Sequence, residues 1–78
     1  MKREDKPLRY EEHARKRMRQ RGISEDQVEK TVRSPDTRGS AKREGAEKLS
    51  KKFTKTRTVI VIAEEEQGFI RIVSAYKG

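Results

Sequence analysis

The sequence predicts an α+β domain in which two N-terminal helices pack on an antiparallel sheet of three to four strands. Apolar residues before Pro35 recur with the three- to four-residue spacing of helices, whereas those after Thr56 follow the pattern of strands. Turn and cap residues separate these segments. Since 78 residues are too few for two hydrophobic cores, residues 1–78 are predicted to form a single domain.

Residues 1–8 are predicted to form a polar lead-in, because Pro7 disfavours helix in the residue before it. The first helix is expected from about Tyr10 to Arg21, where good helix formers predominate. Tyr10, Ala14 and Met18 recur every fourth residue and form one narrow apolar stripe. Gly22 is suited to end this helix.

The second helix has the clearest local start signal in the sequence. Ser24 is a good N-cap, and Gln27 stands three residues later, where it completes a capping box. Ile23 before the cap is expected to pack against Val28. Pro35 ends the helix.

The remaining chain is predicted to form the sheet. Residues 36–57 are polar and basic, with weak strands expected over Arg38–Arg43 and Glu47–Lys55. Thr56–Glu64 and Phe69–Tyr76 are rich in β-branched and aromatic residues and predict a hairpin around a turn at residues 65–68. Both strands carry apolar residues on alternate faces, so one face of the sheet should be covered and the other partly buried.

The charge pattern indicates a polyanionic ligand, most simply RNA. The chain has 21 Lys and Arg residues against 13 Asp and Glu, for a net charge of +8. Residues 33–57 contribute +6 of this charge and residues 58–78 contribute −1. A concentrated positive field attracts anions. The alternative is a charged surface that only keeps the protein soluble.

Several chemistries are excluded by the residues present. The chain has no cysteine and a single histidine, which argues against a zinc site, and it has no glycine-rich phosphate loop. We therefore predict neither a metal nor a cofactor, and read the Glu64–Glu66 run as a solvated turn. The longest apolar run, Val59–Ala63, is too short to span a bilayer, so we predict a cytoplasmic protein without a membrane partner.

The first helix combines the only histidine with a run of cations. His13 stands one turn before Arg17, and five of the seven residues 15–21 are basic. Such a helix can follow the phosphates of a nucleic acid, and we predict this contact for Arg15, Arg19 and Arg21. The alternative for His13 is a ring that packs at the edge of the core and hydrogen-bonds a backbone carbonyl.

A second basic cluster lies before the apolar hairpin. It contains Lys51, Lys52, Lys55 and Arg57, interleaved with Phe53. An aromatic ring between lysines can stack on a base while its neighbours hold phosphates. Equally, the phenylalanine can belong to the core while the lysines protect a sheet edge.

Two hydroxyl groups end the last strand. A regular strand places Ile70, Ile72, Ser74 and Tyr76 on one face, so the hydroxyls interrupt an apolar row. Polar groups in that position suit a site in a groove. The alternative is an ordinary tyrosine at an exposed edge.

Together these residues could cleave RNA without a metal. Attack of the 2′-hydroxyl on the adjacent phosphate needs a base, a proton donor for the leaving oxygen, and cations near the phosphate. His13 and Tyr76 are the candidates for proton transfer. Arg17 and Lys52 are the candidates for charge stabilisation, and Ser74 completes the predicted catalytic set.

A motif extends this reading. The segment His13–Ser24, followed by Val28 and by Ser34-Pro35-Asp36, resembles the "HAxxRMxxRGIS…V…xPD" opening of small prokaryotic proteins in the domain-of-unknown-function family 4258. A Lys-Lys-Phe before the first apolar strand and a closing Ile-Val-Ser-Ala-Tyr also match. The resemblance covers roughly residues 8–77.

That family is similar in architecture to the RelE and BrnT toxins, within a group of metal-independent ribonuclease folds. The resemblance implies a curved antiparallel sheet, an RNA-cleaving site in its concave groove, and an antitoxin protein as a candidate partner. His13, Arg17 and Arg21 match polar residues of the motif, and Ser74 replaces a common threonine while keeping the hydroxyl.

The sequence therefore predicts an RNA-binding protein, with metal-independent RNA cleavage as its candidate activity. The alternatives are a non-catalytic nucleic-acid-binding module and an interaction protein whose charge provides solubility. Salt-dependent RNA binding distinguishes the third reading from the other two, and turnover distinguishes the first from the second. The sequence does not indicate an oligomeric state.

Overall fold

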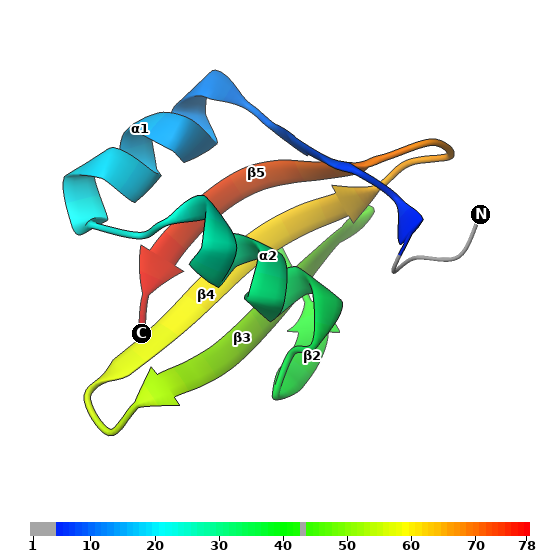
Figure 1. Ribbon diagram of the computed structural model, residues 1–78. Helices are drawn as coiled ribbons and strands as arrows, with labels where there is room; N and C mark the ends of the chain where they lie inside the picture. Colours follow the sequence, from blue (N-terminus) through cyan, green and yellow to red (C-terminus); the bar gives the residue numbers. More distant parts are fainter. Residues whose placement is uncertain (1–4, 43) are drawn as a thin grey trace.

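A five-stranded sheet carries both helices on one face in the computed structural model (Figure 1). The structure describes residues 5–42 and 44–78. The elements in chain order are β1 (Leu8–Tyr10), α1 (Glu12–Arg21), α2 (Glu25–Arg33), β2 (Thr37–Ser40), β3 (Ala46–Thr54), β4 (Arg57–Glu65) and β5 (Ile70–Lys77). The predicted α+β class with two N-terminal helices is confirmed.

The sheet is mixed and has five strands, so the prediction of three to four antiparallel strands is wrong in these two respects. Its order is β1-β5-β4-β3-β2, with antiparallel pairs throughout except that β1 runs parallel to β5. Leu8 pairs with Ile70 and Tyr10 with Ile72. A strand of three residues is too short to show an alternating pattern, which is why the sequence did not reveal β1.

The first helix begins at Glu12 rather than at Tyr10, which lies in β1. Tyr10 still packs against the core that contains Ala14 and Met18, so the predicted apolar stripe crosses from strand to helix. Gly22 ends α1 as predicted. Its φ of 65° lies in the left-handed region, which glycine adopts without steric cost.

The second helix begins with the predicted capping box. The backbone N–H of Gln27 donates to Ser24 Oγ, and the backbone N–H of Ser24 donates to Gln27 Oε1, each over 3.1 Å. Ile23 and Val28 are both buried in the same core cluster. The helix ends at Arg33, two residues before Pro35. No described helix is long and apolar enough to cross a membrane.

Replacing Ser24 with alanine is expected to lower the free energy of unfolding by about 1 kcal/mol, because an amide at the start of α2 loses its acceptor. Urea denaturation of both proteins measures this difference. Gln67→Ala, in the exposed turn between β4 and β5, is the control and should change stability by much less. Equal stability of the Ser24 variant and the wild type would contradict the role of the cap.

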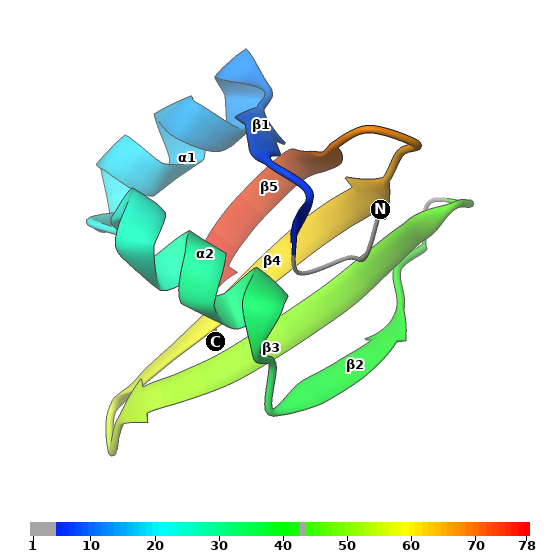
Figure 2. The same cartoon turned by 45° about the vertical axis from the view of Figure 1, so that its right-hand side comes forward.

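The core lies between the helices and the inner face of β3, β4 and β5. In Figure 2, α2 crosses β3 and β4 while α1 lies along β5. The largest fully buried side chains come from both layers: Leu49, Ile70, Ile72, Val28, Val32, Val59, Val61 and Thr31. The predicted strand before Gly45 is present as the shorter β2, and its predicted end at Arg43 lies outside the described residues.

Ion pairs tie the lead-in and the acidic turn to the sheet. Residues 1–4 of the lead-in lie outside the described part, but Lys6 is buried, and its ammonium contacts Glu65 Oε2 at 3.0 Å and the Glu66 carbonyl oxygen at 2.7 Å. The Arg71 guanidinium lies 3.3 Å from Glu64 and 3.7 Å from Glu66. The Glu64–Glu66 run is thus ion-paired within the protein, where the sequence predicted a solvated turn.

A β-bulge in β5 changes which side chains share a face. Ile62 pairs with Ser74 and Ala63 pairs with Ile72, which leaves Val73 as an extra residue. Ile72 is therefore buried under the helices, while Ser74 lies on the opposite, uncovered face. The predicted common face of Ile70, Ile72, Ser74 and Tyr76 is wrong, because alternation was assumed to continue through the bulge.

Candidate nucleic-acid interface

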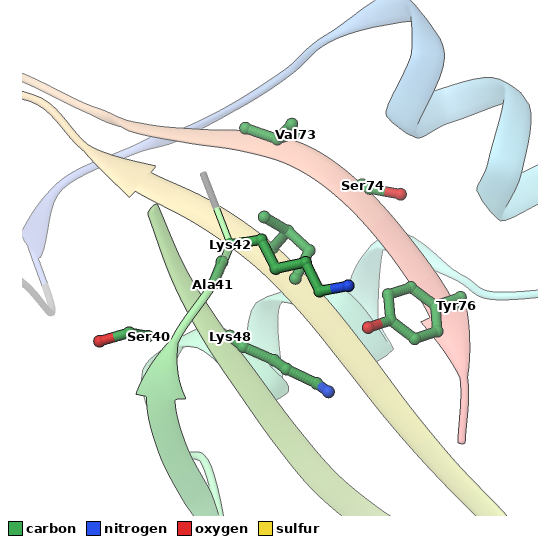
Figure 3. A pocket seen from close by; sticks show the side chains of 8 residues that line it. Ser40, Ala41, Lys42, Lys48, Val73, Ser74 and Tyr76 are labelled. Atoms are coloured by element: carbon green, nitrogen blue, oxygen red, sulfur yellow. The ribbon is translucent and has the colours of Figure 1, made fainter. Parts of the chain in front are cut away.

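A groove of about 490 Å³ lies on the face of the sheet that the helices leave uncovered. Strands β3, β4 and β5 form it together with the end of β2 and the chain that follows (Figure 3). The lining residues are Ser40, Ala41, Lys42, Lys48, Ile62, Val73, Ser74 and Tyr76. The bulge at Val73 is what brings the two hydroxyl residues of β5 to this face.

Strand pairing orders the side chains across the groove. Lys48 pairs with Ile62, which pairs in turn with Ser74, so a cation and a hydroxyl flank an apolar floor. In the next row of this face Ile60 pairs with Tyr76. In Figure 3 the flat face of the Tyr76 ring is turned toward the viewer, and its hydroxyl is directed toward the side where Lys42 and Lys48 extend.

The groove is positively charged. Lys42 and Lys48 are exposed, and no carboxylate is among the lining residues. Within the described part of the chain, neither ammonium forms an ion pair. Both are therefore available to an anion from outside the protein. Apolar and aromatic surface beside cations is the combination that single-stranded nucleic acids require.

Arg21, at the end of α1, contacts one residue that lines the groove. The Arg21 guanidinium lies 6.0 Å from the centroid of the Tyr76 ring, within the range of a cation–π contact. This contact brings a residue of the predicted nucleic-acid-binding set beside a residue of the predicted catalytic set.

His13 and Arg17 lie in a different hollow, which we call the α1 hollow. It measures about 200 Å³ and is lined by His13, Lys16, Arg17 and Gln20. Arg17 Nε donates a long hydrogen bond of 3.5 Å to His13 Nε2. His13 is eight residues from Arg21, or about 12 Å along the helix axis. The structure thus places His13 outside the groove that contains Tyr76.

The other cations of α1 face α2. Arg15 binds Glu25 at 3.0 Å and lies over the Tyr10 ring at 4.7 Å from its centroid. Burial, together with the nearby carboxylates of Glu25 and Glu29, raises the pKa of Tyr10 to about 12, so the phenol stays neutral. Arg15 is therefore engaged within the protein. Arg15, Arg19 and Glu25 line a separate hollow between the two helices.

The residues of the second predicted basic cluster lie on different faces of β3 and at the turn that follows it. Lys51 donates to the Ser34 carbonyl oxygen at 2.9 Å, which stabilises the end of α2. Phe53 packs against the core, in agreement with the structural alternative. Lys52 shares the face of Lys48, about 13 Å away along β3. Lys55 and Arg57 lie at the β3–β4 turn.

Two cations of the groove were not among the sequence-based candidates. Lys48 could have been identified, because Lys48, Ser50 and Lys52 alternate along one predicted strand and so share a face. Lys42 follows β2, and only the folded chain brings it across the sheet toward Tyr76. No sequence signal would have placed it there.

Comparison with known proteins identifies a family. Neither the curated proteins nor the solved structures contain a match. A family model described as a domain of unknown function matches residues 10–77, nearly the whole chain. The matched region includes the capping box, the groove, the α1 hollow and the final strand, which agrees with the motif resemblance found in the sequence. The chain therefore belongs to the family of the domain of unknown function DUF4258.

Proposed function

We propose that this protein binds single-stranded RNA across the uncovered face of its sheet, with the groove at the centre of the site. The observation that carries the proposal is the composition of the groove. Two lysines without carboxylate partners in the described chain lie beside a tyrosine ring and an apolar floor. An RNA ligand also agrees with the predicted cytoplasmic location.

Each part of the groove suits one part of the ligand. The ammonium groups of Lys42 and Lys48 attract phosphates, and binding there releases counterions. A base can stack on the Tyr76 ring, and since every base has a flat aromatic face, this contact does not depend on the RNA sequence. Stacking of this kind needs an unpaired base, so the groove favours single strands over duplexes.

The position of these charges distinguishes the proposal from a solubility function. Charges that only prevent aggregation are expected to be mixed with the opposite sign and spread over the surface. On α2, Lys30 follows that pattern and pairs with Asp26 at 3.1 Å. The groove instead gathers two lysines, and no carboxylate is among the described residues that line it.

Replacing Lys48 with glutamine is expected to weaken RNA binding several-fold at low salt. The slope of log affinity against log salt should become shallower by about 0.7, since one phosphate contact is lost. Fluorescence anisotropy with a labelled single-stranded RNA measures both quantities. Lys30→Gln removes the same charge from α2 and is the matched control. Equal losses in the two variants, or affinity that does not depend on salt, would contradict a site in the groove.

Metal-independent RNA cleavage is a second candidate function. The supporting observation is the Tyr76 hydroxyl, which is directed toward the side of Lys42 and Lys48 in Figure 3. In this reaction the 2′-oxygen attacks phosphorus, and the 5′-oxygen leaves with a proton from Tyr76. The 2′-hydroxyl proton passes to a water molecule, since neither a histidine nor a carboxylate is among the described residues that line the groove, and the lysines stabilise the added negative charge. The products are a 2′,3′-cyclic phosphate and a 5′-hydroxyl.

The resemblance of the sequence to its family implied an architecture similar to that of the RelE and BrnT toxins, and this expectation is the ground for the second candidate and for the proposal of an antitoxin partner. Incubating purified protein with single-stranded RNA and a chelator tests the activity directly. Cleavage that continues in chelator supports it. RNA that stays intact from about pH 5 to 8, the range over which histidine usually titrates, would leave RNA binding alone.

A further inference from the structure

We infer that a bound RNA strand leaves the groove over the edge of β5 and places a second phosphate in the α1 hollow. This inference rests on the proposed function, because it assumes that the groove holds RNA. It adds a second site, its ligand group and the path that joins the two sites.

The α1 hollow is built from hydrogen-bond donors. His13, Lys16, Arg17 and Gln20 occupy one face of α1 at helical spacing and enclose about 200 Å³. No carboxylate lines the hollow, and Lys16 and Arg17 form no ion pair within the described residues. Arg17 donates its Nε–H to His13. The N–H groups on its two terminal guanidinium nitrogens can therefore donate to a phosphate.

The edge of β5 is open between the two sites. Among the described strands, β1 pairs with β5 only as far as Ile72, so residues 73–77 have no strand neighbour on that side. Figure 3 shows the Ser74 hydroxyl directed toward the outer edge of β5 rather than into the centre of the groove. A strand of RNA can therefore pass over this edge and meet polar groups as it does so.

Arg21 lies at the junction of the two sites. Its guanidinium is 6.0 Å from the Tyr76 ring centroid in the groove. Arg17 of the α1 hollow precedes it by one helical turn, about 6 Å along the axis. Cations are thus found at Lys48 in the groove, at Arg21 beside it and at Arg17 in the α1 hollow. Among the described residues that line the two sites there is no carboxylate.

The two sites together require a minimum length of RNA. A short oligonucleotide can occupy the groove alone. A longer one reaches the α1 hollow as well, and the second contact then forms within the complex at a high effective concentration. Affinity and salt dependence should therefore both increase once the RNA exceeds this length.

A length series tests this inference with the full chain. Single-stranded RNAs of about 2 to 16 nucleotides, which bracket the site sizes of single-strand-binding domains, are titrated into wild type, Arg17→Gln and Lys30→Gln. The shortest RNAs should bind all three proteins equally. With long RNAs, wild type and Lys30→Gln should gain affinity and steepen in salt slope by about 0.7 per added contact, whereas Arg17→Gln should not.

Each outcome decides one point. Equal weakening of Arg17→Gln at every length, or the same length dependence in Arg17→Gln as in wild type, would overturn the second site. Lys48→Gln separates this failure from that of the proposed function. If Lys48→Gln weakens the binding of RNAs of every length while Arg17→Gln binds all of them like wild type, only the proposal of the α1 site is wrong. If Lys48→Gln has no effect at any length, the groove itself is wrong. Unchanged thermal unfolding of each variant ensures that folding is not the cause.

Discussion

In the proposed cleavage reaction, replacing Tyr76 with phenylalanine is expected to lower the rate by about 100-fold or more, the usual contribution of a general acid. The substitution removes the hydroxyl that would protonate the leaving 5′-oxygen and keeps the ring. Affinity for RNA should change far less, because stacking needs only the ring. Cleavage of end-labelled RNA under single-turnover conditions, combined with anisotropy measurements of binding, checks both statements.

Tyr76→Ala is the companion variant. It removes ring and hydroxyl together, so binding and cleavage should both fall, and the Arg21 guanidinium loses the ring beneath it. Wild-type cleavage by the phenylalanine variant would exclude Tyr76 as the proton donor, whatever its part in binding.

His13→Ala is measured in the same assay because the sequence assigned the histidine to proton transfer. Its imidazole lies in the α1 hollow and not in the groove. A loss of roughly 100-fold in cleavage with binding retained would assign His13 a place in the reaction. The scissile phosphate would then lie where the RNA passes between the two sites. A loss confined to the binding of long RNAs would assign His13 to the second phosphate instead.

Replacing Leu49 with alanine is expected to lower the free energy of unfolding by about 2–5 kcal/mol, the range found when a buried leucine is truncated. Leu49 is fully buried in the central part of β3, under the helices. For a chain of this size the total stability is on the order of 4–12 kcal/mol, so the variant should be close to unfolding at 37 °C.

Urea denaturation with a matched leucine measures this effect. Leu8 on β1 is only partly buried and packs at the margin of the core. Leu8→Ala should therefore cost less than Leu49→Ala. Equal losses from the two substitutions would contradict a core centred between the helices and β3, β4 and β5.

The parts of the fold that the sequence predicted well are determined by neighbouring residues. The start of α2 depends on Ser24 and Gln27, which are three residues apart and bond to each other. The end of α1 depends on Gly22 alone. By contrast, β1 exists because Leu8 pairs with Ile70, some sixty positions later. Local patterns contain no information on such a pairing, and Tyr10 suits a helix as well as a strand in this context.

The candidate site was predicted in part for similar reasons. Tyr76 and Ser74 were noticed because hydroxyls follow an apolar alternation, yet their face was misassigned because the bulge at Val73 is not visible in the sequence. The cations of α1 were treated as one group, although helix geometry and the neighbouring α2 divide them. Arg15 is engaged with Glu25, while Arg17 faces the α1 hollow.

The central claim is that RNA binds the face of the sheet that the helices leave uncovered. Backbone amide chemical shifts of isotope-labelled protein, recorded while single-stranded RNA is added, test it most directly. The expected result is that the largest changes occur in β3, β4 and β5 beside the groove, around Lys48, Ile62, Ser74 and Tyr76. Changes confined to α2 and the β4–β5 turn, with the groove residues unmoved, would contradict it.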